Sequence, residues 1–424
     1  MRLARRRALS WTDHGSVKIP FFPVLCGLLS LAFPGPRLEA CTTAIVSAKA
    51  TVDGRPLLLK HRDADELQNT LMFFADGRYS YIGLVNASDP QGQEVWAGCN
   101  SAGFAIMNSA SYNLNIGDNS PAKDREGRIM KQALQSCATT GDFENMLRGL
   151  PKPLGAEANF GVIDAKGGVA YYETGNSGFK KFDANDPAVA PFGYLIRTNY
   201  SYTGKREEDF GLIRYRTAEE LFYMASARHA LSHEFIIRDV SRCLRHSLTK
   251  TDLTEDVPPA SSGPHFVSFR DYIPRFISSA SVIVHGVAPG ESPQLATMWT
   301  ILGFPLCAVA VPTWVAGGPQ LPRILMADGS GKAPLCQAAM TLKKRCFPID
   351  RGSGDSYLDL SALLNQGGDG ILQKIRPFED GLLKEIGRRT AGWREKGIEP
   401  GEVDKTYRWL DEVVPAFYKD RFGL

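Results

Sequence analysis

The sequence lacks a hydrophobic run long enough to span a membrane. The main apolar stretch, Phe21 to Phe33, has 13 residues, contains Pro23 and is followed by Pro34. A spanning helix needs about 20 predominantly apolar residues, and no later segment offers even about 18 without interruption. We therefore expect no stable insertion into a membrane.

A strong net charge is also lacking once the first forty residues are set aside. The whole chain has 49 Lys+Arg and 46 Asp+Glu, of which residues 1–40 hold six and two, so that 43 and 44 remain. The excess of positive charge thus belongs to the N-terminal segment. A nucleic-acid partner has no electrostatic support.

Several common catalytic motifs are missing as well. There is no GxSxG serine motif, and Gly329-Ser330-Gly331-Lys332 is no phosphate-binding loop, because Ala333 stands where Ser or Thr is needed. His229 and His233 have the spacing of two metal ligands on a helix, but no third ligand lies nearby in the sequence, so we expect a solvated helix face. We expect neither a metal nor an organic cofactor.

What the N-terminus does have is the pattern of a secretory leader. A basic start (Arg2, Arg5, Arg6, Arg7) precedes the apolar stretch, and Leu38-Glu39-Ala40 offers a cleavage site. The polar segment before Val17 is long for a leader, so the translation start stays open. We predict that residues 1–40 are a cleaved signal peptide and that the product is secreted or periplasmic.

Cleavage after Ala40 would make Cys41 the first residue of the mature chain. Its α-amine, with an ordinary pKa of about 7.7–8.0, can accept a proton, and its thiol, at about 8.5, becomes a nucleophile on losing one. One residue would then supply both nucleophile and base. Cys41 is therefore the candidate catalytic residue.

Six further cysteines follow Cys41 (Cys99, Cys137, Cys243, Cys307, Cys336 and Cys346). In an oxidising compartment they could pair, but fifteen pairings are possible for six cysteines. Only Cys336 and Cys346 are close in the sequence. Disulfides and buried thiols both remain open.

Hydrophobic patterning predicts a mixed α+β protein. Short strands are expected at 43–46, 57–59, 81–85, 95–97, 104–107, 160–163, 169–172, 194–196, 280–287, 297–302 and 307–311. Helices are expected at 128–137, 143–150, 209–227, 234–244, 371–396 and 402–418. We assign residues 41–330 to the main domain and residues 331–424 to a helical extension packed on it.

Five segments in order resemble the linear-amide hydrolases of the N-terminal-nucleophile superfamily, which include bile-salt hydrolases, penicillin V acylases and isopenicillin N acyltransferases. The first two are Cys41-Thr42-Thr43 and Lys60-His61-Arg62-Asp63, which stands where the family has GRNxD. The resemblance implies a four-layer αββα sandwich in which Asp63 orients the thiol and amine of Cys41. Lys60 replaces the usual arginine, and it lacks the planar fork of a guanidinium.

The other three segments, together with Arg214, supply the rest of the implied site. Gly98 to Asn108 is similar to a turn and strand that ends in an oxyanion asparagine, which makes Asn108 the candidate and Asn113 the poorer one. Asn159 to Glu173 resembles the core hairpin, and Tyr194 to Asn199 resembles the strand that ends in the second oxyanion asparagine, Asn199. Arg214 takes the place of a site arginine, with Arg216 as its competitor.

The resemblance implies hydrolysis or acyl transfer at the linear C–N amide of a small N-acyl substrate through an acyl-Cys41 intermediate. Two alternatives remain: a dipeptidase of the same superfamily, and a lipid-anchored binding protein, because Leu38-Glu39-Ala40-Cys41 also resembles a bacterial lipobox. The acyl and amine specificity and the oligomeric state, a homo-oligomer included, stay open.

Overall fold

Six antiparallel strands from three distant parts of the chain form the sheet that carries Cys41. In this computed structural model, which describes residues 40–205, 210–260 and 263–424, their order is β10-β1-β2-β14-β15-β16. The bounds are Tyr194–Arg197 for β10, Ala40–Val46 for β1, Leu57–Asp63 for β2, Ser278–His285 for β14, Thr297–Leu302 for β15 and Ala310–Thr313 for β16. The predicted leader lies outside the described residues apart from Ala40.

A second sheet of seven strands follows the chain order without a crossover. Its strands are β3 (Asn69–Phe74), β4 (Tyr81–Asn86), β5 (Ala97–Asn100), β6 (Ala105–Ala110), β7 (Ala158–Ile163), β8 (Val169–Gly175) and β9 (Gly178–Asp183). Every neighbouring pair is antiparallel. Such pairing needs only short connections, which suits the turn-rich sequence of this half.

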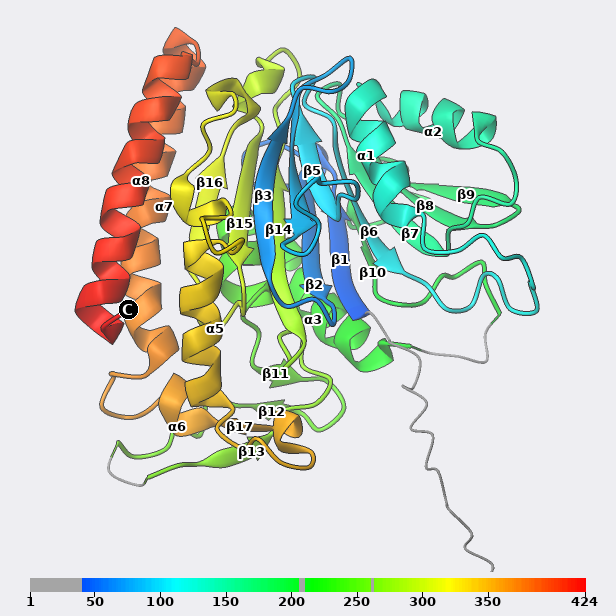
Figure 1. Cartoon of the computed structure of the whole chain (residues 1–424). Coiled ribbons are helices and arrows are strands. Elements are labelled where there is room, and N and C mark those ends of the chain that lie inside the picture. The colour runs from blue at the N-terminus through cyan, green and yellow to red at the C-terminus, as the bar shows by residue number, and fades with distance from the viewer. Residues whose placement is uncertain (1–39, 206–209, 261–262) are drawn as a thin grey trace, which may run out of the picture. The chain divides into compact units, whose positions relative to one another are not determined.

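Side chains of the two sheets meet in the interior. The Tyr171 hydroxyl on β8 donates a hydrogen bond of 2.8 Å to Thr43 Oγ1 on β1. Lys60 on β2 reaches Asn108 on β6. Strands β1 and β2 therefore pack against β6, β7 and β8 (Figure 1).

Helices cover both sheets. α1 (Glu126–Ser136) packs on β4, β5 and β6, and α2 (Thr140–Gly149) packs on β9. α1 buries Ile129, Ala133 and Leu134 as its sequence pattern predicts, and a capping box between Thr139 and Asp142 begins α2. α3 (Leu212–Ala227) packs on β1 and β10 of the other sheet; the predicted helix start at Asp209 lies outside the described residues.

The C-terminal third adds further helices. They are α5 (Pro334–Cys346), α6 (Leu360–Leu363), α7 (Ile371–Lys396) and α8 (Pro400–Phe422), and α5 packs on β15. Figure 1 shows α7 and α8 side by side beyond β16. No helix within the described ranges is both long and apolar enough to cross a membrane. The described residues all belong to one compact unit, and the predicted division at residue 330 stays a prediction.

Several sequence expectations differ from the structure. The predicted helix at 234–244 is a short α4 (His233–Phe235) followed by a π-helical turn, η2 (Ile236–Val240). The expectation of a solvated helix face for His229 and His233 is wrong for His233, whose ring stacks on that of His285 at 4.4 Å between centroids. β3, β9 and α5 were not predicted.

Small elements complete the described chain. The two-stranded ribbons are β11 (Arg245–His246) with β12 (Thr251–Asp252), and β13 (Phe266–Ser268) with β17 (Tyr357–Asp359). The 3-10 turns are η1 (Ala48–Ala50), η3 (Pro293–Leu295), η4 (Val315–Gly317), η5 (Arg323–Leu325) and η6 (Gly354–Ser356). Gly54, at a φ of 71°, lies in the connection between β1 and β2, where the left-handed conformation suits a residue without a Cβ.

Candidate active site

Cys41 is the second residue of β1 and lies opposite Arg62 of β2. Its side chain is almost fully buried, with 3% exposed. Side chains alternate between the faces of a strand, so Cys41 shares its face with Thr43. Since Thr43 contacts Tyr171 of the second sheet, the Cys41 thiol faces the space between the two sheets.

Asn199 holds the backbone nitrogen of Cys41. The Cys41 N–H donates to Asn199 Oδ1 at 3.0 Å, and the same oxygen accepts from Arg214 Nη2 at 2.9 Å. Asn199 Nδ2 donates to the carbonyl oxygen of Ala110 at 3.0 Å. Two donors at one amide atom and an acceptor at the other fix the orientation of this side chain. Removal of the leader would turn the Cys41 nitrogen into an α-amine. The acceptor for this nitrogen, Asn199 Oδ1, is already in place.

Arg214, near the start of α3, is buried against the same segment. Its Nη1 donates to the Cys41 carbonyl oxygen at 2.6 Å and to Thr42 Oγ1 at 3.1 Å. The pKa of Arg214 is lowered to about 10, mainly by burial and also by the like charge of Arg275, while Asp63 and Cys41 act in the opposite direction. Arg214 thus holds the backbone of the candidate nucleophile from the helix side of the sheet.

Of the two arginines that the sequence left open, only Arg214 reaches Cys41. Arg216 forms an ion pair with Glu219, with an Nη1–Oε2 distance of 2.8 Å, and its side chain is 59% exposed. Two residues along a helix turn the side chain by about 200°, which places it on the opposite face. The structure therefore brings Arg214, not Arg216, to the site.

Asp63 ends β2 opposite Ala40, the residue before Cys41. Its Oδ1 accepts from Ser278 Oγ at 2.5 Å and its Oδ2 from Arg275 Nε at 2.8 Å. By strand alternation Asp63 lies on the helix side of the sheet, the face of Thr42 and Arg214. The carboxylate is held beside the segment to be cleaved, and its predicted orienting role toward the Cys41 thiol stays a prediction.

His61 lies on the same face and is fully buried between two serines. Its Nε2 is 3.0 Å from Ser278 Oγ and its Nδ1 is 2.8 Å from Ser281 Oγ. Burial lowers its pKa to about 4, and Arg214 and Arg275 also lower it, against the opposing effect of Asp63. His61 is therefore neutral near pH 7, and its low pKa makes it a weak base, poorly matched to general-base catalysis at that pH.

Lys60 and Asn108 form a second contact between the sheets. Lys60 Nζ donates to Asn108 Oδ1 at 2.5 Å and to the Asn108 carbonyl oxygen at 2.9 Å. Lys60 lies opposite Thr43 and so projects to the same side as Cys41. The structure brings Lys60 and Asn108 together on the face that carries the thiol.

The other asparagines considered have structural partners. Asn113 Oδ1 accepts from Ser111 Oγ and from the Ser201 N–H, and its Nδ2 donates to the carbonyl oxygen of Ser201. Asn159 Nδ2 donates to the carbonyl oxygens of Thr198 and Tyr200. Both asparagines fix the loop after β10, which positions Asn199.

An aromatic pocket of about 190 Å³ adjoins this loop. It is lined by Arg197, Thr198, Tyr200, Tyr202, Phe210, Leu212, Tyr215 and Arg216. Thr198 and Tyr200 flank Asn199 in the chain, and Leu212, Tyr215 and Arg216 belong to the same helix as Arg214. The pocket thus shares both of its supporting segments with the Cys41 site.

Sequence reasoning missed Arg275 and Ser278, the two partners of Asp63. They lie more than two hundred residues beyond it, at the start of β14 and in the segment before it. The strand itself was expected at 280–287, but nothing in its pattern pairs it with β2. The run Ser278-Ser279 ahead of an apolar strand is the one local signal, since serines at a buried strand start need partners.

The seven cysteines of the described residues are all buried, and no disulfide joins them. Cys346 lies beside Cys307, with a distance of 3.8 Å between the sulfur atoms, rather than beside Cys336. The interpretation as buried thiols therefore holds in this structure. Over the same ranges, no three His, Cys, Asp or Glu side chains gather as metal ligands would.

Comparisons of the sequence match no family model and no curated protein. Comparison of the structure finds similar solved proteins. The N-acylethanolamine-hydrolyzing acid amidase ortholog of Caenorhabditis elegans is 14% identical, with a TM-score of 0.38, over 60% of this chain and 93% of that one.

Two bacterial enzymes are similar to the same extent. A variant of the conjugated bile acid hydrolase from Clostridium perfringens is 11% identical, with a TM-score of 0.35, over 65% of this chain and 92% of that one. Penicillin V acylase from Agrobacterium tumefaciens is 12% identical, with a TM-score of 0.35, over 65% and 86%. They belong to the group that the Cys41 motifs resemble, but at these TM-scores the likeness carries no argument about this chain.

Proposed function

We propose that this chain is an exported, cysteine-dependent amidase that cleaves the linear C–N amide bond of an N-acyl small molecule. The observation that carries the proposal is the arrangement at Cys41: Asn199 accepts from its nitrogen and Arg214 donates to its carbonyl oxygen, while the thiol faces the interior. This arrangement fixes the nitrogen, the carbonyl and the strand direction of one cysteine. Such positioning is what a nucleophile needs to attack in one defined geometry.

Cleavage of the Ala40–Cys41 peptide bond would activate the site. The Cys41 nitrogen would become an α-amine beside Asn199 Oδ1 and accept the thiol proton. The thiolate then attacks the substrate carbonyl carbon and forms a C–S bond, and the carbonyl electrons move to the oxygen. Collapse of this intermediate breaks the C–N bond, and the ammonium group returns its proton to the leaving amine.

The resulting thioester on Cys41 is resolved by water. The α-amine takes a proton from the water, the hydroxide attacks the acyl carbon, and the carboxylic acid leaves as the thiol is restored. An amine in place of water would give acyl transfer instead. Neither route needs a metal or an organic cofactor.

The tetrahedral oxyanion needs donors, and Asn108 and Asn199 are the proposed ones. Asn108 is held by Lys60 on the face that carries the thiol. Asn199 contacts the Cys41 nitrogen directly and is rigid because Arg214 and Ala110 bind both ends of its amide. Preorganised amides of this kind stabilise a developing negative charge.

The arrangement of the elements supports a four-layer αββα sandwich. The two sheets meet at Thr43, Tyr171, Lys60 and Asn108, with α1 and α2 on one sheet and α3 on the other. In this proposal the C-terminal helices are an addition to the sandwich. The aromatic pocket beside Asn199 would receive part of the acyl group, and its small volume favours a short or single-ring acyl chain.

A lipid-anchored binding protein remains the alternative from another class. Its lipidated cysteine would have to leave the sheet, whereas Cys41 is hydrogen-bonded within it and 3% exposed. Nothing in the described residues specifically favours a dipeptidase over an amidase.

The proposal is tested with a panel of N-acyl amides, read by release of the free amine from the purified mature protein. Turnover of at least one amide, with an acyl group trapped on Cys41 after acid quenching and located by peptide mass, supports it. An acyl group trapped on another residue, or turnover by the Cys41→Ala variant, overturns it.

A further inference from the structure

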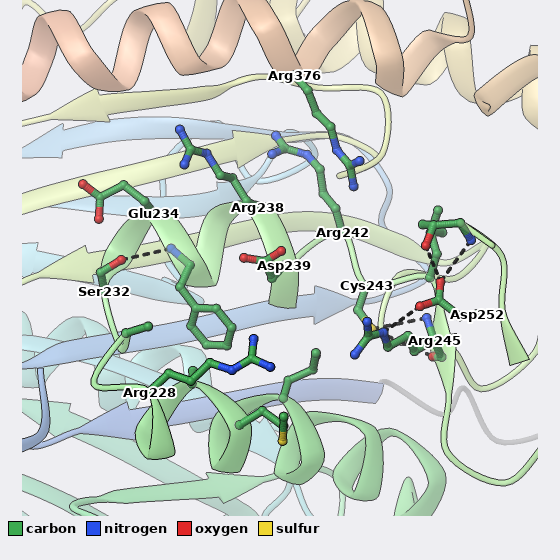
Figure 2. A pocket seen from close by; sticks show the side chains of 17 residues that line it. Arg228, Ser232, Glu234, Arg238, Asp239, Arg242, Cys243, Arg245, Asp252 and Arg376 are labelled. Carbon is green, nitrogen blue, oxygen red and sulfur yellow. Dashed lines mark hydrogen bonds and ion pairs between the residues drawn. The ribbon is translucent and has the colours of Figure 1, made fainter. Parts of the chain in front are cut away.

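A cavity of about 590 Å³ opens between α3, the α4–η2 segment, the β11–β12 ribbon and α7, apart from the residues of the Cys41 site. Five arginines line it: Arg228, Arg238, Arg242, Arg245 and Arg376. Figure 2 shows Arg228 on one wall and Arg376 on the opposite one, with Arg238 and Arg242 on the segment between them. Its acidic lining residues are Glu234, Asp239 and Asp252.

Two of these arginines form ion pairs and hydrogen bonds within the fold. Arg242 is fully buried and pairs with Glu379, while its other nitrogens donate to the carbonyl oxygens of Pro305 and Ala308. Arg245 Nε binds Asp252 Oδ2 at 2.7 Å across the β11–β12 ribbon. These contacts build the wall of the cavity and neutralise Asp252.

Arg238 uses only part of its guanidinium in contacts within the fold. Its Nη2 pairs with Asp380 Oδ1 at 2.6 Å, on a side where both groups are about half exposed. Its Nε is buried and, among the described residues, has no hydrogen-bond partner. A buried guanidinium N–H without a hydrogen-bond acceptor lowers the stability of the fold, and a bound ligand could supply the acceptor.

Arg228 and Arg376 have no ion pair or side-chain hydrogen bond with any residue of the described ranges, although both line the cavity. Arg376 also lies near Arg242; burial lowers its pKa, and the like charge of Arg242 lowers it further. Asp239 offsets this charge only in part: burial raises its pKa while Arg376 lowers it, and in the described chain no cation lies within ion-pair distance of its carboxylate. Five arginines thus face three carboxylates in the lining, which leaves the lining with an excess of positive charge.

We propose that this cavity binds a small organic phosphate monoester. A phosphate carries about two negative charges and three acceptor oxygens, which several converging guanidinium forks can share, whereas a single carboxylate satisfies about one fork. Leu221, Met224 and Phe235 supply an apolar floor for the organic part. The volume lies in the range typical of small-molecule sites, about 300–1,000 Å³.

Binding is measured by calorimetry with phenyl phosphate on the purified full chain, at constant ionic strength, with phenol as the uncharged control. We expect saturable binding of phenyl phosphate and none of phenol. Each of Arg228→Gln and Arg376→Gln should raise the dissociation constant about tenfold or more, because each removes charged hydrogen bonds. Arg376→Lys should recover only part of the affinity, since lysine lacks the fork.

Arg388→Gln is the matched control, because Arg388 lies on the same helix, is 72% exposed and pairs with Glu385 outside the cavity. It should leave the affinity unchanged. Vesicles with and without phosphatidic acid distinguish a lipid headgroup from a soluble phosphate. If only the vesicles that contain phosphatidic acid compete with phenyl phosphate, the phosphate that binds in the cavity can be a lipid headgroup. Absence of saturable binding, or equal binding by the Arg228→Gln/Arg376→Gln double variant with an unchanged melting temperature, overturns the proposal.

Discussion

Arg214 and Arg228 lie at opposite ends of α3 and have opposite surroundings. Fourteen residues separate them, close to four turns, so both project from nearly the same side of the helix. Arg214 is 2% exposed and its guanidinium binds Cys41, Thr42 and Asn199. Arg228 is exposed at the end of the helix and faces the arginine-lined cavity.

The difference shows how one residue type serves two tasks on one helix. A guanidinium whose donors are taken by backbone and side-chain oxygens fixes the geometry of its partners. A guanidinium that faces a cavity and has no ion pair of its own among the described residues is suited to an external anion. In our proposals Arg214 is therefore a positioning residue and Arg228 a ligand-binding one.

The largest effect should come from the residue that Arg214 positions. Cys41→Ala should lower kcat by about 10⁴ or more, as removal of a nucleophile does, and Cys41→Ser should lose most activity because a hydroxyl is far less acidic than a thiol. Iodoacetamide should label Cys41 before the other cysteines, since burial raises the pKa of Cys99 to about 12 and of Cys137 to about 11. Amine release and peptide mass after labelling are the measurements. Faster labelling of another cysteine, with activity retained in Cys41→Ala, would contradict the assignment.

Asn199 should rank next. Loss of one oxyanion donor typically costs about 10²–10³ in kcat, and Asn199→Ala removes the acceptor for the Cys41 nitrogen as well. We expect kcat to fall by at least this factor with little change in KM or melting temperature.

Asn199→Asp separates the two roles of this residue. The aspartate keeps an acceptor for Cys41 and Arg214 but has no amide hydrogens. Activity close to that of the wild type in Asn199→Asp would assign Asn199 to positioning alone and leave Asn108 as the proposed donor. Near-normal kcat in a folded Asn199→Ala variant would remove Asn199 from the mechanism.

The two arginines can then be compared directly. Arg214→Gln should lower kcat by about 10², because a nucleophile displaced by about 1 Å loses roughly this much, while Arg228→Gln should not change it. Arg214→Lys should restore only part of the activity, since it cannot bind three acceptors as a fork does. Equal kcat values for Arg214→Gln and Arg228→Gln would contradict the assignment of different roles to these two arginines.

A smaller effect is expected in the pH dependence of stability, through His61 on the Arg214 side of the sheet. Its pKa is about 4 in the folded chain and about 6.5 when unfolded, so the unfolded state binds more protons between these values. The free energy of unfolding should therefore fall as the pH drops from about 6.5 to 4, by up to roughly 3 kcal/mol from this group. Denaturant titrations of the wild type and His61→Gln across this range measure it. An unchanged slope in the variant would show that His61 is not buried in its neutral form.

Much of the secondary structure could be predicted from the sequence because its patterns are local. The strands of Thr43–Val46 and Leu57–Leu59 and the helix around Ile129 and Leu134 follow from hydrophobic spacing alone. The order of the six-stranded sheet could not, because β14 pairs with β2 across more than two hundred residues and no local signal records that pairing.

The site divides in the same way. Motif order gave Cys41, Asn199 and Arg214, which the structure brings together. The partners of Asp63 and the direction of the Asn199 amide depend on the packing of distant segments. The helix expected through Leu244 ends earlier, where Arg242 turns inward to Glu379, a contact that helix propensity does not record.

The claim that Cys41 is a nucleophile released by cleavage is tested most directly by the mass of the N-terminal peptide in the active, purified protein. We expect a peptide that begins at Cys41 with an unmodified α-amine and an unmodified thiol, and no turnover in protein that retains residues before Cys41. Full activity in protein whose N-terminus lies upstream of Cys41, or an acyl modification on the Cys41 of all active molecules, would contradict it.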